Sequence, residues 1–458
     1  MRRVHAPVLY SKRPKRLGSF LSRRRDTFGK STFAIHRQRL LATCFLVVAS
    51  AIFAAAQSAE TDTALLSELK KNSHALSIGE GQLSGEGAEF LTAEAGRAQF
   101  CLVGEEHGFA ENSIFAAALL RRIQQVGYKY FASEIGKLTT GRLEPAARQT
   151  NVREVFAEFN QRYPFSLPFF NWREEADLLT VALGPPRGKL PTWWGIDQEF
   201  FFSPIYHFER LRQLAKTPDS QKVVGEYYEK VRTELARSRE AHNPQSAFIV
   251  SAKPDDFKNL EAAFSDKDTE AREIVRALQE SWQIYQKNFR GEQYVNNLQR
   301  SRLLKRNFMS YYDEAHKLEK QPHVFFKFGA AHIFRGRNYV NVFDLGNMAS
   351  ELAESQGATS FHILVLAADG TYNKYIPFIG NEADKTKKLD AQSVYSYLDV
   401  KPFVTLAESA DWQVIDLRPL RPLLGTKQLS QVPRGFTEVI CGFDAVVVVK
   451  QAHPSSLF

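Results

Sequence analysis

Acidic residues and histidines recur directly after short apolar stretches of this sequence. The run Gly-Glu-Glu-His-Gly at 104–108 follows Phe-Cys-Leu-Val, and Glu134 comes shortly after Tyr-Phe-Ala. Asp197 comes shortly after Trp-Trp-Gly, and His332 comes shortly after Phe-Lys-Phe. One such ending alone is usually a solvated loop charge or a helix cap, but four of them together indicate a single cleft with acid-base chemistry.

The first of these endings has the most specific chemistry. Gly104 allows a tight turn, and Glu105 and His107, two residues apart in an extended turn, can face the same space. Glu106 should then face elsewhere. A carboxylate beside an imidazole fixes its tautomer and raises its basicity, which suits a general base near neutral pH.

Strands and helices must position these side chains, and the apolar stretches are the predicted strands. They are Phe100–Val103, Tyr128–Ala132, Thr192–Gly195, Val324–Phe328, Ser360–Ala367, Gln413–Ile415 and Ala445–Val449. Apolar strands without alternation are typical of a largely parallel sheet with helices on both faces. The sequence therefore predicts an α/β fold, and ligands of such sheets bind beyond the carboxyl ends of the strands.

The chain divides into three predicted parts. Residues 1–56 are a signal peptide, 57–98 are an N-terminal segment whose polar part up to Glu89 should be loosely ordered, and 99–458 are the α/β domain. Between about 204 and 320 the chain is almost wholly helical, with apolar residues at helical spacing. We expect this long helical insertion to cover the carboxyl ends of the strands.

The first 56 residues have the composition of an export signal. They contain twelve Lys or Arg residues and one acid, Asp26, and the apolar run from Leu40 ends in Ala-Ala-Ala56. This pattern predicts cleavage before Gln57 and a periplasmic or secreted protein. The run is short for a membrane span, so contact with a membrane would come only through an uncleaved leader. Three arginines at 23–25 leave twin-arginine export as an alternative route.

The basic excess of the chain lies in this leader. The formal net charge is +9 for the full chain, but without the leader 48 basic residues stand against 50 acidic ones. A near-neutral mature protein does not favour nucleic-acid binding, so the expected partner is a small-molecule or peptide substrate. Two cysteines lie outside the leader, Cys101 and Cys441, and they could pair or stay as two buried thiols.

An aromatic run with two prolines, Tyr163–Trp172, follows the second predicted strand. Its prolines predict an irregular loop near the strand ends. Such a loop could form the wall of an apolar substrate pocket, or it could simply pack over the sheet.

The motifs at the strand ends resemble those of the erythromycin esterase-like family, within the broader group of ChaN-type haem-binding lipoproteins and Tiki-type metalloproteases. The resemblance covers most of the mature chain. Gly-Glu followed by His-Gly is similar to the family's first catalytic motif, although the Glu-x-His spacing of Glu105 and His107 is closer to the ChaN type than to the esterases' Glu-x-x-His. Glu134 and Asp197 lie where the family has its second-strand glutamate and its Gly-hydrophobic-Asp.

Two later segments extend the resemblance. The run Arg-Ser-Arg-Leu-Leu-Lys-Arg-Asn at 300–307 is similar to an esterase helix, which implies that Arg300 and Arg302 bind substrate anions together with Asp197. A spacing of two on a helix lets at most one of these arginines point inward. His332 matches the second histidine of the esterases' His-x-x-His, whereas Gly329 takes the place of the first.

The leading interpretation is hydrolysis of an ester, lactone or amide, with no cofactor required. His107 would activate water, Glu105 would orient His107, and Glu134 and His332 would position water or polarise the substrate. No Gly-x-Ser-x-Gly motif is present, which disfavours an acyl-enzyme.

Three alternatives stay open. The same four residues could bind zinc, manganese or cobalt in a metal-dependent hydrolase or protease of Tiki type. A non-catalytic protein of ChaN type could instead bind haem or another small ligand through His107, His332 or a nearby tyrosine. The four residues could also form a buried polar network that only holds the strand ends together.

Overall fold

The structure, a computed structural model, describes residues 63–185, 188, 190–374, 386–390, 394–407, 411–426, 429 and 432–458. All of them belong to one unit, Glu60–Phe458. The predicted leader and its cleavage site lie outside the described residues.

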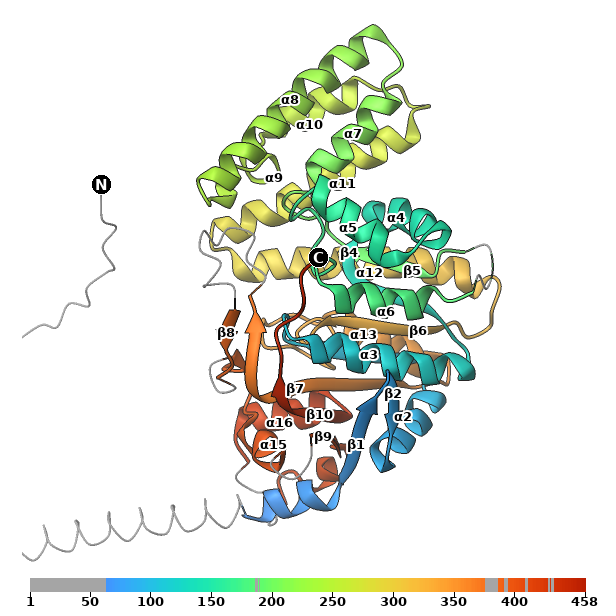
Figure 1. The fold of residues 1–458 in the computed structure, drawn as a ribbon, viewed down its shortest axis with the longest axis vertical. Helices are drawn as coiled ribbons and strands as arrows, with labels where there is room; N and C mark the ends of the chain where they lie inside the picture. The colour runs from blue at the N-terminus through green and yellow to red at the C-terminus, as the bar shows by residue number, and fades with distance from the viewer. Residues whose placement is uncertain are drawn as a thin grey trace, which may run out of the picture. The chain divides into compact units, whose positions relative to one another are not determined.

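The centre of the fold is a ten-stranded sheet (Figure 1). Its strands are β1 (Ser73–Gly79), β2 (Gln82–Ser84), β3 (Phe100–Glu105), β4 (Tyr128–Gly136), β5 (Trp193–Asp197), β6 (His323–Gly329), β7 (Ser360–Asn373), β8 (Thr386–Lys388), β9 (Trp412–Asp416) and β10 (Ala445–Ala452). Their order is β2-β1-β9-β10-β7-β3-β6-β4-β5, with β8 paired to β7. The neighbours from β10 to β5 are parallel, and the remaining pairs are antiparallel. The predicted α/β class with a largely parallel sheet is confirmed.

Each of the seven predicted strands coincides with a strand of the structure, and their starts differ by at most one residue. The sequence missed β1, β2 and β8. These strands lie at the margins of the sheet, and their side chains are mostly exposed or half-buried. They therefore lack the continuous apolar runs that mark the central strands.

The segment before residue 99 is ordered where the structure describes it, so the prediction of loose order is wrong. Residues 63–71 form a helix, and β1 pairs with both β2 and β9 at the edge of the sheet. A few leucines, among them Leu65, Leu69 and Leu91, are buried and fix this segment to the rest. They are widely spaced among polar and small residues, which hides their contribution in the sequence.

Helices cover both faces of the sheet, as the apolar strands predicted. One face packs against α2 (Glu86–Arg97), α3 (Ala110–Ile123), α4 (Lys137–Gln149), α5 (Val152–Arg162) and α6 (Arg173–Leu183). The other packs against α12 (Gln293–His316), α13 (Leu345–Ser355), α15 (Lys401–Leu406) and α16 (Arg434–Gly442). Successive strand residues alternate between these two cores, since Cys101 and Val103 belong to the first and Leu102 to the second.

The chain between β5 and β6 is helical. It forms α7 (Pro204–Leu214), α8 (Pro218–Glu240), α9 (Phe248–Ser251), α10 (Pro254–Ala262), α11 (Thr269–Phe289) and α12. Short 3-10 helices occur at η1 (Gln124–Val126), η2 (Pro244–Ser246) and η5 (Arg418–Leu423). Helices α7, α8, α10 and α11 form the green-to-yellow group in Figure 1, and α12 returns along β5. None of the described helices has the length and hydropathy needed to cross a membrane.

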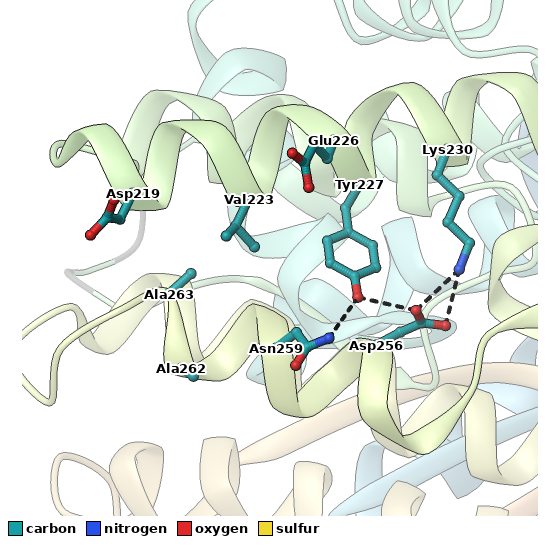
Figure 2. Close-up of a pocket in the computed structure, with 9 residues that line it drawn as sticks. All are labelled: Asp219, Val223, Glu226, Tyr227, Lys230, Asp256, Asn259, Ala262 and Ala263. Carbon is teal, nitrogen blue, oxygen red and sulfur yellow. Dashed lines mark hydrogen bonds and ion pairs between the residues drawn. The ribbon is translucent and has the colours of Figure 1, made fainter.

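A hollow of about 550 Å³ lies between α8 and α10 (Figure 2). Its polar side chains bond one another: the Lys230 Nζ lies 3.0 Å from Asp256 Oδ2, and the Tyr227 hydroxyl donates to Asp256 Oδ1 at 3.1 Å. No histidine lines it. The hollow is larger than the cavity at the strand ends, but its polar groups are used in the contact between two helices, since Tyr227 and Lys230 both bond Asp256.

Candidate active site

The four residues predicted to be catalytic meet at the carboxyl ends of β3, β4 and β6. Glu105 is the last residue of β3, Glu134 lies near the end of β4, and His332 is in the turn after β6. Glu134 stands between the two imidazoles: its Oε2 lies 3.7 Å from His107 Nε2, and its Oε1 lies 3.6 Å from His332 Nε2. The strand order places them together because β6 lies between β3 and β4.

His107 is oriented from two sides. Its Nδ1 lies 2.9 Å from Glu105 Oε1, so the neutral ring donates its Nδ1 proton to this carboxylate and keeps Nε2 as an acceptor. The Phe169 ring stacks on the imidazole with centroids 4.2 Å apart. The His107 side chain is 26% exposed, more than those of the other three residues, so its Nε2 is the group best placed to meet a substrate.

The pKa of His107 is raised to about 9. Burial of the ring opposes protonation, but the hydrogen bond to Glu105 and the negative charges of Glu134, Glu105 and Glu106 outweigh it. The sequence predicted a base poised near neutral pH. In the free protein the pKa of His107 is instead alkaline, because three carboxylates surround the ring rather than one.

A buried lysine that the sequence analysis missed holds Glu105. The Lys327 Nζ on β6 donates to Glu105 Oε1 at 2.8 Å and also bonds Glu175 Oε1, which accepts from the Ser113 hydroxyl at 2.7 Å. Burial would raise the pKa of Glu105, but the charges of Lys327 and His107 lower it. The carboxylate is therefore held ionised beneath the imidazole. A signal was present, since a lysine within Phe-Phe-Lys-Phe is rarely buried unless it is paired.

Arg300 fixes the second carboxylate. Its Nη2 donates to Glu134 Oε1 at 2.6 Å and to Asp197 Oδ2, and its Nε donates to Asp197 Oδ1 at 3.0 Å. The backbone N–H of Gly329 donates to Glu134 Oε2 at 2.9 Å. Burial would raise the pKa of Glu134, but His332, Arg300 and His107 hold it well below its usual range. Asp197 and Arg300 thus lie beside the four central residues, whereas their predicted contact with a substrate anion stays a prediction.

Arg302 is not brought together with the other predicted site residues. Its side chain is exposed on α12, whereas Arg300 points inward. Two residues along a helix correspond to a rotation of about 200°, so the two arginines necessarily face opposite directions.

Asp344 is the partner of the second histidine and was also missed. Its Oδ2 lies 2.9 Å from His332 Nδ1, and its Oδ1 accepts from the N–H of Leu345 at 2.8 Å. Burial and the charge of Arg300 oppose protonation of His332, but Asp344 and Glu134 raise its pKa. In the sequence Asp344 has the pattern of an ordinary helix N-cap, which concealed its second role.

Glu106 lies outside the catalytic group. Its Oε2 accepts from the Tyr397 hydroxyl at 2.7 Å, and burial raises the pKa of its carboxyl group. Glu105 is therefore the carboxylate that contacts His107, as predicted.

Gly329 gives His107 and Glu134 the space they occupy. A Cβ at this position would lie 3.1 Å from His107 Nε2 and 3.4 Å from Glu134 Oε2. A histidine in this place, as in the esterases' His-x-x-His, would point straight at these groups. In this chain, His107 and Glu134 therefore occupy the space where the resemblance implies a second imidazole.

A cavity of about 410 Å³ opens from His107 and Glu134. Residues of α11 and α12 line it together with Phe169, so part of the helical insertion does cover the strand ends. The loop Tyr163–Trp172 does both, because Phe169 lines the cavity while Phe170 is buried with its ring centroid 4.9 Å from that of Trp193 on β5. The chain end supports this region, since Ser455 N donates to the Gly108 carbonyl and Arg173 N to the Ser456 carbonyl.

The site does not have the donor arrangement of a metal centre. Within the described ranges, no three His, Cys, Asp or Glu side chains are placed to bind one metal ion. Two cations, Arg300 and Lys327, already contact the carboxylates that would be its ligands.

The two cysteines outside the leader are free thiols. Cys101 is buried in β3 and Cys441 is exposed on α16, so the expectation that both are buried is wrong for Cys441.

No protein-family model and no curated protein sequence matches this chain. Solved structures do. A succinoglycan biosynthesis protein has a TM-score of 0.55 at 13% identity over 85% of this chain and 97% of its own. A Bacillus cereus protein has a TM-score of 0.53 at 14% identity over 87% and 99%. A mutant of the erythromycin esterase EreC in its open conformation has a TM-score of 0.50 at 15% identity over 80% and 94%.

These likenesses establish the fold. The chain has an erythromycin esterase-like α/β fold, and any family relationship is a distant one. The resemblance found in the strand-end motifs is confirmed to that extent, whereas the links to the ChaN and Tiki types stay predictions.

Proposed function

We propose that this protein is an exported hydrolase of the erythromycin esterase-like type, which cleaves an ester, lactone or amide with water activated at His107. The observation that carries the proposal is the placement of His107, whose Nδ1 is held by Glu105 while its Nε2 faces a cavity beside Glu134. The fold shared with an erythromycin esterase supports this class of reaction.

Each residue of the site has a separate role in the proposed reaction. Neutral His107 accepts a proton from water at Nε2 while the water oxygen adds to the substrate carbonyl carbon. His332, whose raised pKa favours the protonated ring, can donate to the oxygen that gains negative charge. The proton on His107 then passes to the leaving oxygen or nitrogen. Glu105, Glu134 and Lys327 keep the two rings in position throughout.

The metal-dependent alternative is less favoured, because Arg300 and Lys327 bond the carboxylates that a metal would need. Haem binding has no observation of its own in its favour, and a visible absorption spectrum of the purified protein would reveal it.

Hydrolysis should show an alkaline pH dependence. Below the His107 pKa of about 9 the ring is protonated and cannot accept a proton, so kcat/KM should fall about tenfold per pH unit on the acid side. At pH 7 about one hundredth of the maximal rate would be left. The measurement is kcat/KM from pH 6 to 10 on an aryl acetate, a lactone and an anilide, with and without a chelator. Absence of turnover on all three contradicts the proposal, and a rise centred near pH 6.5 contradicts the role of the raised pKa.

Export is part of the proposal and has its own test. The basic segment, the run from Leu40 and the Ala-x-Ala ending at Ala56 predict that the mature chain starts at Gln57. N-terminal sequencing of protein from the cell envelope or medium should return this start. Full-length chain recovered from the cytoplasm would contradict it.

A further inference from the structure

We infer that the substrate carries a neutral, hydroxyl-bearing ring beside the bond that is cleaved, as in an O-acylated sugar. This inference rests on the proposed hydrolase function and adds a substrate class to it. It follows from the lining of the cavity that opens from His107.

The charged groups of this cavity are already paired. Arg300 bonds both Asp197 and Glu134, and His107 bonds Glu105. Among the described lining residues, an anionic substrate group would find no uncommitted cation, and a cationic group would find no uncommitted carboxylate. A charged substrate group would have to break one of these ion pairs and leave a buried charge without its partner, which costs several kcal/mol. The part of the substrate in this cavity is therefore neutral.

Amide side chains are frequent in the lining. They are Gln198, Asn288, Gln293, Asn296 and Asn297. Three of them use part of their capacity within the protein, since Gln293 Nε2 donates to Asn288 Oδ1 at 3.2 Å and Asn296 Nδ2 donates to the Ile284 carbonyl at 2.6 Å. An amide offers both donor N–H groups and an acceptor oxygen, so it can bond a hydroxyl group in either direction. The Oε1 atom of Gln198 is buried and has no hydrogen-bond partner in the described part of the chain. A buried acceptor without a partner costs about 1–3 kcal/mol, and a substrate hydroxyl would remove this cost.

Aromatic rings share the cavity with these amides. Phe169 stacks on His107, and Phe201 stacks on Tyr285 with centroids 4.0 Å apart. Phe169 has a left-handed backbone with φ of 63°, a strained conformation for a bulky residue and one that tends to occur at functional sites. A sugar ring presents C–H groups on its faces and hydroxyls at its edge, so the faces match the aromatic rings and the edge matches the amides. A plain acyl chain would match only the rings.

The reaction balances with one water and no co-reactant. The water oxygen bonds to the acyl carbon, and the bond from this carbon to the sugar oxygen breaks. The proton that His107 takes from water goes to the sugar oxygen. The products are a carboxylic acid and the free sugar hydroxyl.

A matched pair of esters tests the inference: methyl 6-O-acetyl-glucoside, and cyclohexylmethyl acetate, which has the same ester on a six-membered ring without hydroxyls. The protein should have a kcat/KM about 30- to 150-fold higher for the glucoside, since two or three hydrogen bonds of about 1 kcal/mol each separate the two. Gln198→Leu should reduce this preference about fivefold, the factor that one such bond contributes, and Asn297→Leu serves as a second variant should the first fail to fold. Gln283→Leu changes an exposed amide of α11 outside the cavity and should leave the preference intact.

The outcomes are distinguishable. Equal kcat/KM for the two esters, or a preference that neither cavity variant reduces, overturns the sugar inference and leaves the hydrolase proposal standing. A preference for a peptide anilide over the glucoside overturns it in favour of a peptide substrate. Turnover of neither ester, together with no turnover of an aryl acetate, overturns the hydrolase proposal and the inference with it.

Discussion

His107→Ala should lower kcat/KM by a factor of about 10² to 10⁴ at pH 9, the range that a general base contributes. The expectation follows from the Nε2 atom, which faces the cavity while Glu105 holds the other ring nitrogen. The loss should shrink toward acidic pH, because the wild-type ring is protonated there and contributes little as a base. The measurement is kcat/KM of wild type and variant on the best ester substrate, at pH 7 and at pH 9.

Two controls separate loss of the base from loss of the fold. Glu106→Gln alters the neighbouring residue, which bonds Tyr397 and not His107, and should change kcat/KM by only a few-fold. His323→Ala removes an imidazole at the opposite end of β6 and should be similarly mild. If His107→Ala keeps most of its activity while Glu106→Gln loses it, the roles assigned to these two side chains are wrong.

The sequence predicted the central part of the fold because its strands are continuous apolar runs that are buried on both faces. It missed β1 because Leu76 is the one buried residue of Ser73–Gly79, and because the partner strand β9 is more than 300 residues away. The pairing of such distant segments leaves no local pattern. A polar, small-residue-rich composition was therefore interpreted as loose order, although its few leucines are buried.

The candidate site could be predicted in part for a related reason. Glu105, His107, Glu134 and His332 follow strands that the sequence does mark, and in a parallel sheet those ends share one edge. Their partners come from elsewhere in the fold. Glu175 lies on α6 and Phe169 lies in an irregular loop, and nothing in their local sequence ties them to a strand end. The pKa of His107 could not be predicted either, because it depends on the summed charges of residues distant in the chain.

Arg300→Leu should destabilise the protein by about 3 kcal/mol at pH 7, near the low end of the cost of leaving buried carboxylates without their cation. We use the low end of this range because the Arg300 side chain is 23% exposed to solvent, which weakens its interactions. The carboxylates of Glu134 and Asp197 are more deeply buried, with side chains only 8% and 6% exposed. Without the guanidinium, two neighbouring carboxylates would repel each other and the pKa of Glu134 would rise. Urea unfolding at pH 7 measures the difference.

The same substitution should also change how stability depends on pH, because Arg300 is one of the groups that lower the pKa of Glu134. In the wild type the folded-state pKa of Glu134 is depressed, so its contribution to stability is present above the unfolded value near 4.5 and is lost as the pH falls through the folded value. In the variant the folded-state pKa would be raised, so protonation at falling pH relieves the destabilisation. The difference in unfolding free energy between the wild type and Arg300→Leu should therefore become smaller as the pH falls from 7 to 4. Arg302→Leu is the matched control, since this arginine is exposed on the same helix and its loss should cost less than about 0.5 kcal/mol. Two outcomes would show that Arg300 does not hold the two carboxylates as described: equal effects of the two substitutions, or a difference in unfolding free energy between wild type and Arg300→Leu that does not decrease at low pH.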